Sequence, residues 1–152
     1  MATRSNIAYR TPDGRIVSIY CHWDGYPENN GKILAEHYTD SIKIAELVGL
    51  GGISSLRPEI GEKHPFSKFE CKEDEYDGAA YENMTTFYCR DRGEELVISV
   101  YDDIPSWIAD MEEYAYLWNG TEWLVNDHGE LDEKGRFPMF SRVVDVLEMD
   151  DA

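Results

Sequence analysis

Hydrophobic and polar residues alternate in the first part of the chain. In residues 15–23 (RIVSIYCHW) one face of a strand would carry Val17, Ile19, Cys21 and Trp23, and the other Ser18, Tyr20 and His22. The first face is the apolar one, so we expect Cys21 and Trp23 to be buried and His22 to point away from them. Residues 6–10 form a second strand, joined to the first by the Pro-Asp-Gly turn at 12–14.

Two short helices are predicted next, over residues 30–38 and 41–48. Thr39 or Asp40 is the expected N-cap of the second helix. Helical spacing would place Ile42, Ala45 and either Val48 or Leu47 on its buried face.

Strand patterns return in the second half of the chain. We expect strands at 85–90 and 95–101, joined by a turn, and one or two helical turns within 105–111. Asn-Gly at 119–120 lies between alternating aromatic segments, 114–118 and 122–126, and is a strong hairpin signal. Residues 141–149 are interpreted as a short helix with Ser141 as N-cap, or as an edge strand.

These elements predict one α+β domain over residues 1–152. Its order is an N-terminal β-hairpin, two short helices, an antiparallel meander and a short C-terminal helix. The buried face of the 114–126 hairpin stays open at this point. It carries either the aromatic set Tyr114, Tyr116 and Trp118 or the set Ala115 and Leu117.

The charge is unevenly distributed along the chain. The formal net charge is −17 over 152 residues. Residues 1–69 contain eight acidic and eight basic residues, whereas residues 70–152 contain 23 acidic and six basic ones, and 6 − 23 = −17. Such a surface disfavours direct nucleic-acid binding, which needs basic groups to neutralise phosphates. It indicates either solubility alone or a surface that binds a basic partner.

The acidic half supplies the candidate partner contacts. They are Glu73, Asp74, Glu75, Asp77, Asp102, Asp103, Glu112 and Glu113. The predicted partner is a protein with a basic surface. We predict no cofactor and no metal. We also predict no membrane contact, because no apolar run approaches the roughly 20 residues of a membrane helix.

A second candidate site lies in the segment YCHWDGYP, residues 20–27. Cys21, His22 and Asp24 are the residue types of a small catalytic or metal site, but neighbouring residues on a strand point to opposite faces, which separates Cys21 from His22. A structural role at the end of a strand is the favoured interpretation. Tyr20, His22, Asp24 and Tyr26 are alternatively the lining of a shallow ligand pocket.

Three stretches of the chain resemble small uncharacterised accessory proteins of tailed bacteriophages. They are the opening MATRSNIAYRTPDGRIVSIYCHWDGYP, the segment GGISSL and the hairpin YAYLWNGTEWLV. The resemblance implies a small accessory protein in the bacterial cytoplasm, where such proteins often antagonise host defences, and it carries over no catalytic residue. Three widely spaced cysteines agree with a reducing compartment.

Three functions follow as hypotheses. The first is a non-enzymatic inhibitor whose acidic surface mimics a nucleic acid on a CRISPR effector or restriction enzyme. The second is a binder of nucleotide second messengers that uses the 20–26 segment together with Arg10, Arg15 and Arg57. The third is a small enzyme that uses Cys21, His22 and Asp24.

Overall fold

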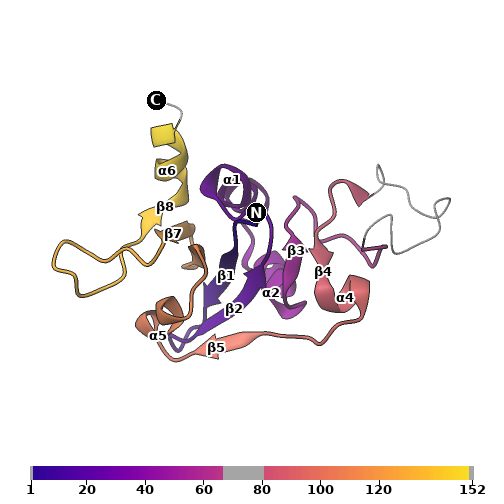
Figure 1. The fold of residues 1–152 in the computed structure, drawn as a ribbon, viewed down its shortest axis with the longest axis horizontal. Coiled ribbons are helices and arrows are strands. Elements are labelled where there is room, and N and C mark those ends of the chain that lie inside the picture. Colours follow the sequence, from indigo (N-terminus) through magenta and orange to yellow (C-terminus); the bar gives the residue numbers. More distant parts are fainter. Residues whose placement is uncertain (1, 67–80, 151–152) are drawn as a thin grey trace.

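The computed structural model describes residues 2–66 and 81–150, and it has a mixed α+β architecture (Figure 1). The helical elements are the π-helical turn η1 (Pro27–Gly31), α1 (Lys32–His37), α2 (Ser41–Gly49), α4 (Tyr88–Arg92), α5 (Ile104–Ala109) and α6 (Val143–Asp150). The strands are β1 (Ser5–Arg10), β2 (Ile16–Cys21), β3 (Ile53–Ser55), β4 (Thr86–Phe87), β5 (Ser99–Tyr101), β6 (Tyr114–Trp118), β7 (Trp123–Asp127) and β8 (Ser141–Arg142).

All strands belong to one mixed sheet. Its order is β4-β3-β2-β1-β6-β7-β8, and β5 pairs with β2 outside this path. The β1–β2 and β6–β7 pairs are antiparallel hairpins, as predicted, and β7 continues to β8 as an antiparallel meander. The pairs β1–β6 and β2–β3 are parallel, so distant parts of the chain meet at the centre of the sheet.

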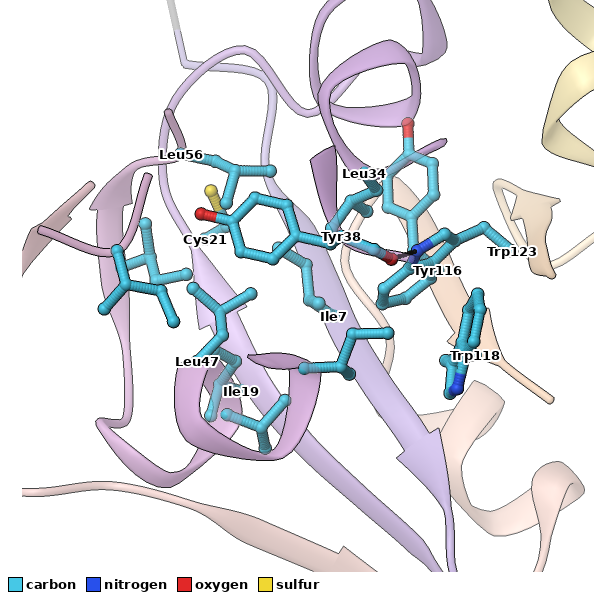
Figure 2. Packing of buried hydrophobic residues seen from close by; sticks show 14 of the residues in the cluster. Ile7, Ile19, Cys21, Leu34, Tyr38, Leu47, Leu56, Tyr116, Trp118 and Trp123 are labelled. Atoms are coloured by element: carbon cyan, nitrogen blue, oxygen red, sulfur yellow. Dashed lines mark hydrogen bonds between the residues drawn. The ribbon is translucent and has the colours of Figure 1, made fainter. Parts of the chain in front are cut away.

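Residues that are paired across adjacent strands form rows, and successive rows point to opposite faces of the sheet. One row joins Ile19, Ile7, Tyr116 and Val125, and all four belong to the larger hydrophobic cluster, together with residues of α1 and α2. Figure 2 shows this cluster, in which the Trp123 indole N–H donates to the Tyr38 carbonyl at 2.7 Å.

The next row faces α5 on the other side. It joins Ser18, Ala8, Leu117 and Leu124, and Trp107 of α5 packs over it. Both faces of the β6–β7 hairpin are therefore buried. This answers the question left open by the sequence, since Ala115 and Leu117 face α5 while Tyr116 and Trp118 face the larger cluster.

Local signals placed several elements correctly. The Asp40 carboxylate accepts from the Ile42 N–H at 2.8 Å and caps α2. The side chain of Asn119 accepts two backbone N–H bonds in the 119–122 turn, where Gly120 has a φ of 100°. The turn between β1 and β2 closes through the Gly14 N–H and the Thr11 carbonyl at 2.9 Å.

Other predictions were wrong. Residues 88–92 form α4 rather than the end of a strand, because the Asp91 side chain accepts the Phe87 N–H at 2.8 Å and turns the chain. Strand β5 covers only three of residues 95–101 and pairs with β2, so 85–90 and 95–101 are not neighbours.

The buried face of α2 also differs from the prediction. It carries Ile44, Leu47 and Val48, whereas Ile42 is 78% exposed and Ala45 is exposed. Helix α1 covers only part of residues 30–38, because Pro27 and Asn30 belong to the preceding π-helical turn η1. Ser141 lies in β8, so residues 141–149 contain both an edge strand and a helix.

Candidate functional site

In the turn after β2, the backbone at Asp24 and Gly25 packs closely against neighbouring parts of the chain. Asp24 has a left-handed φ of 55°, and its carbonyl accepts from the Asn30 N–H and the Asn29 side chain. Asp24 thus braces the turn through its backbone. A Cβ on Gly25 would lie 2.8 Å from Thr3 O and from Ser5 Cβ, so this position accepts no side chain.

Cys21 lies on the core side of this turn, as predicted. It is fully buried, and the Asn30 side chain donates to its sulfur at 3.3 Å. Burial raises the pKa of the Cys21 thiol to about 11. A nucleophilic cysteine needs a lowered pKa and a nearby base, so this thiol is suited to packing rather than to attack on a substrate.

His22 points away from Cys21 and contacts aromatic side chains. Its Nδ1 lies 2.6 Å from the Tyr20 hydroxyl, and its ring meets Trp23 edge-on with centroids 4.7 Å apart. The prediction that Trp23 is buried was wrong, since 44% of it is exposed. The strand ends at Cys21, and the His22 and Trp23 N–H groups bond to Ile53 O and Ser54 O, so the alternation of faces ends there.

The structure brings together only part of the predicted ligand pocket. Tyr20 and His22 are in contact, whereas no hydrogen bond or ring contact within 2–66 and 81–150 joins Tyr26 to either of them. Tyr26 is 38% exposed and precedes η1, where its carbonyl accepts from the Asn29 and Asn30 N–H groups.

The arginines of the nucleotide hypothesis lie apart from this pair. Arg10 pairs with Ile16 and Arg15 lies in the β1–β2 turn, at the opposite end of β2 from Cys21. Five residue steps of strand separate the two ends by about 17 Å. Arg57 lies beyond β3, where its backbone bonds to the Thr85 hydroxyl. These residues therefore do not form one anion site.

Five acidic residues lie next to α5 in the sequence and at its ends. Asp103 caps this helix, with its carboxylate accepting the Ser106 N–H at 2.8 Å, and exposed Asp102 precedes it. Asp110 ends the helix, and half-buried Glu112 and Glu113 follow. The structure records no ion pair to any of these five carboxylates among the described residues. The other predicted contacts, Glu73, Asp74, Glu75 and Asp77, lie outside the described residues.

The charge imbalance extends well beyond α5. Residues 93–133 contain no Lys or Arg, and their 12 acidic residues are Glu94, Glu95, Asp102, Asp103, Asp110, Glu112, Glu113, Glu122, Asp127, Glu130, Asp132 and Glu133. Some of these are balanced from outside the segment. Arg142 Nε lies 2.8 Å from Glu122, and Arg92 lies 3.5 Å from Glu94. Among the residues that the structure describes, no such counterion is recorded for the carboxylates beside α5.

Arg90 and Asp91 form a buried charged cluster that the sequence patterns did not predict. The Asp91 side chain is fully buried and accepts from Arg90 Nε at 2.9 Å and from the backbone N–H groups of His64 and Phe87. Arg90 also donates to the carbonyls of Ile60, Gly61 and Thr85. The partners lie up to 30 residues apart, so no local pattern could have revealed them. The hydrogen bonds of Asp91 and Arg90 are made within the protein, and they connect the 60–64 loop to α4.

The described residues show neither a metal site nor a membrane span. Within 2–66 and 81–150, no group of three or more His, Cys, Asp or Glu side chains is arranged to hold a metal ion. No helix of that part of the chain is long and apolar enough to cross a bilayer.

Comparison with known proteins adds no further assignment. No family model, no curated protein and no solved structure matches the chain.

Proposed function

We propose that the acidic surface around α5 docks on a basic, nucleic-acid-binding channel of a host defence protein and blocks it without catalysis. A CRISPR effector or a restriction enzyme is the kind of partner that fits, given the resemblance to phage accessory proteins. Asp102, Asp103, Glu112 and Glu113 are the proposed contacts that lie within the described residues.

One observation carries this proposal. Five carboxylates with no ion-pair partner in 2–66 and 81–150 flank a single short helix, inside a stretch of 41 residues that has no Lys or Arg. Exposed acids are ordinarily interspersed with bases. A cluster of like charges instead steers an oppositely charged partner and raises its association rate.

The carboxylates lie at both ends of α5. Helix α5 has six residues and is therefore about 9 Å long. Asp102 and Asp103 lie at one end and Asp110 at the other. Acidic groups therefore lie at both ends of a length of about 9 Å.

The helix holds its acids in place before any partner arrives. Trp107 is 1% exposed, and its indole N–H donates to the Ser18 hydroxyl of β2 at 2.9 Å. The side-chain and backbone bonds of Ser106 lower the pKa of Asp103, which keeps this carboxylate ionised in mildly acidic solution. A preformed anionic surface loses little conformational entropy on binding.

The test is binding to purified CRISPR effectors and restriction enzymes over a salt series. The variant D102N/D103N/E112Q/E113Q removes four charges, and Asn at 103 retains the N-cap. Its control, E36Q/E46Q/E59Q/E62Q, removes four charges from exposed positions elsewhere. We expect the first variant to lose at least about tenfold in affinity and the control to lose less than about threefold. Equal losses, or binding that salt does not weaken, would refute the proposal.

A further inference from the structure

Strand β5 leaves one edge of the sheet open. It pairs antiparallel with β2 through Ser99–Ser18, Val100–Val17 and Tyr101–Ile16, and within the described residues it has no other strand partner. Figure 1 shows β5 and the chain that leads to it from α4 along the margin of the molecule. Such an edge presents unpaired N–H and C=O groups to any extended chain that approaches it.

The side chains of this edge are unusually apolar for exposed positions. Val100 of β5 is 57% exposed, and in the chain that leads into β5 Leu96 is 51% and Val97 57% exposed. Natural edge strands are ordinarily protected by charges, prolines or bulges. Between Glu95 and Asp102 the sequence LVISVY contains none of these residues. The edge thus has the composition of a strand that is paired on both sides.

The segment is held in position by the body of the protein. A Cβ on Gly51 would lie 2.6 Å from Leu96 Cδ1 and 3.4 Å from Val97 O, so the chain rests directly on this glycine. Gly51 has a φ of 82°, which glycine adopts without strain. The chain that leads into β5 is therefore packed against Gly51, and β5 itself is paired with β2.

Charge decides which partner fits the edge. Glu94 and Glu95 precede the apolar run, and Asp102 and Asp103 follow it. A second copy paired antiparallel about the centre of the run would place Glu95 opposite Asp102 and Glu94 opposite Asp103, and like charges opposite each other destabilise a sheet. Each copy also carries a net charge of −17. A strand with basic residues at both ends meets no such repulsion.

We infer that residues 96–101 accept an extended segment of a basic partner as an added strand. The backbone of that segment would pair with the free edge of β5, and its apolar side chains would cover Val97 and Val100. Its Lys or Arg residues would lie beside Glu95 at one end and Asp102 at the other. This inference rests on the proposed binding of a basic partner and specifies the geometry of the contact.

The probe is a synthetic peptide of alternating valine and threonine with two lysines at each end. Its control is the same peptide N-methylated at alternate residues, which keeps the charges and side chains but removes backbone donors. We expect the first peptide to bind at least about tenfold more tightly by calorimetry and to protect amides of residues 96–101 from solvent exchange. Equal affinity of the two peptides, or protection confined to other strands, would overturn the inference.

Variants supply the second arm of the test. V97K/V100K places charges on the edge, and I42K/V144K adds the same two charges at apolar positions of α2 and α6 that are 78% and 41% exposed. We expect the first variant to weaken peptide binding at least about tenfold and the control less than about threefold. Comparable effects would contradict strand addition. Where V97K/V100K does not fold, the comparison of the two peptides still decides.

The same variants separate this inference from the proposed function. A host complex that binds wild type and V97K/V100K equally well would refute strand addition and leave acidic docking in place. Peptide binding at β5 without binding to any host complex would refute the proposed function and retain the site. A homodimer that V97K/V100K dissolves would assign the edge to a second copy and overturn the basic partner.

Discussion

Replacing Trp107 by phenylalanine tests how α5, and the acids around it, are attached to the sheet. Trp107 is 1% exposed and packs in the cluster with Ala8, Ile16 and Leu117. Its indole N–H donates to the hydroxyl of Ser18, which is itself only 2% exposed. Phenylalanine keeps an aromatic ring at this position but removes the donor and the second ring.

The expected loss of stability has two parts. The Ser18 hydroxyl loses its buried partner, which costs about 1–3 kcal/mol. The atoms of the missing ring are no longer buried, which adds about 1 kcal/mol. Trp107→Phe should therefore lower the free energy of unfolding by about 2–4 kcal/mol.

Urea denaturation followed by circular dichroism measures this loss. Ser18→Ala and the double variant Trp107→Phe/Ser18→Ala complete a double-mutant cycle. Ser18→Ala leaves the indole N–H without a partner and should by itself cost about 1–3 kcal/mol. The double variant should lose less than the sum of the two single losses, by about 0.5–3 kcal/mol, because no orphaned polar group remains. A loss below about 0.5 kcal/mol for Trp107→Phe would refute this account of how α5 is held.

Three further predictions concern the core and the turn. Asp91→Ala should cost about 3–5 kcal/mol in urea denaturation, because it leaves the partly buried Arg90 guanidinium and two backbone N–H groups without their acceptor; a loss below about 1 kcal/mol would show that the cluster is not a brace. Gly25→Ala should cost about 1–3 kcal/mol through its contacts with Thr3 and Ser5, and a stable variant would contradict the close packing of the turn. Burial raises the pKa of Cys21 from 9.0 to about 11. A raised pKa contributes stability below pH 9 that is lost as the pH rises towards 11, by a few kcal/mol. Cys21→Ala should remove this part of the alkaline loss in pH-dependent unfolding.

Features fixed by neighbouring residues could be predicted from the sequence. The Asn119-Gly120 turn, the Asp40 cap and the burial of Cys21 each depend on contacts within a few residues or on the alternation of a regular strand. The α+β class follows from the same local patterns. These signals are physical properties of short segments and need no knowledge of the rest of the chain.

Features fixed by distant residues could not be predicted. Trp23 was expected inside because alternation was extended past Cys21, where backbone bonds to Ile53 and Ser54 end the regular strand. The helix at 88–92 depends on a carboxylate that also bonds to His64, 27 residues away. The pairing of β5 with β2 joins residues more than 80 positions apart.

The candidate sites show the same division. The sequence located the acidic half, but the structure shows that Asp102, Asp103, Glu112 and Glu113 flank one anchored helix. The sequence also placed Tyr20 beside His22, since residues two apart on a strand share a face. It did not reveal the exposed edge of β5, because exposure depends on which strands pair with it.

If the acids around α5 occupy the site of a nucleic acid, this protein and DNA must compete for the same host complex. A fluorescently labelled duplex is bound to a CRISPR effector or restriction enzyme that this protein binds, and its displacement is followed by anisotropy as the protein is added. We predict full displacement by the wild-type protein, and for D102N/D103N/E112Q/E113Q a midpoint shifted upward at least about tenfold relative to the E36Q/E46Q/E59Q/E62Q control. A ternary complex in which protein and duplex are bound together, or equal midpoints for the two variants, would contradict the claim.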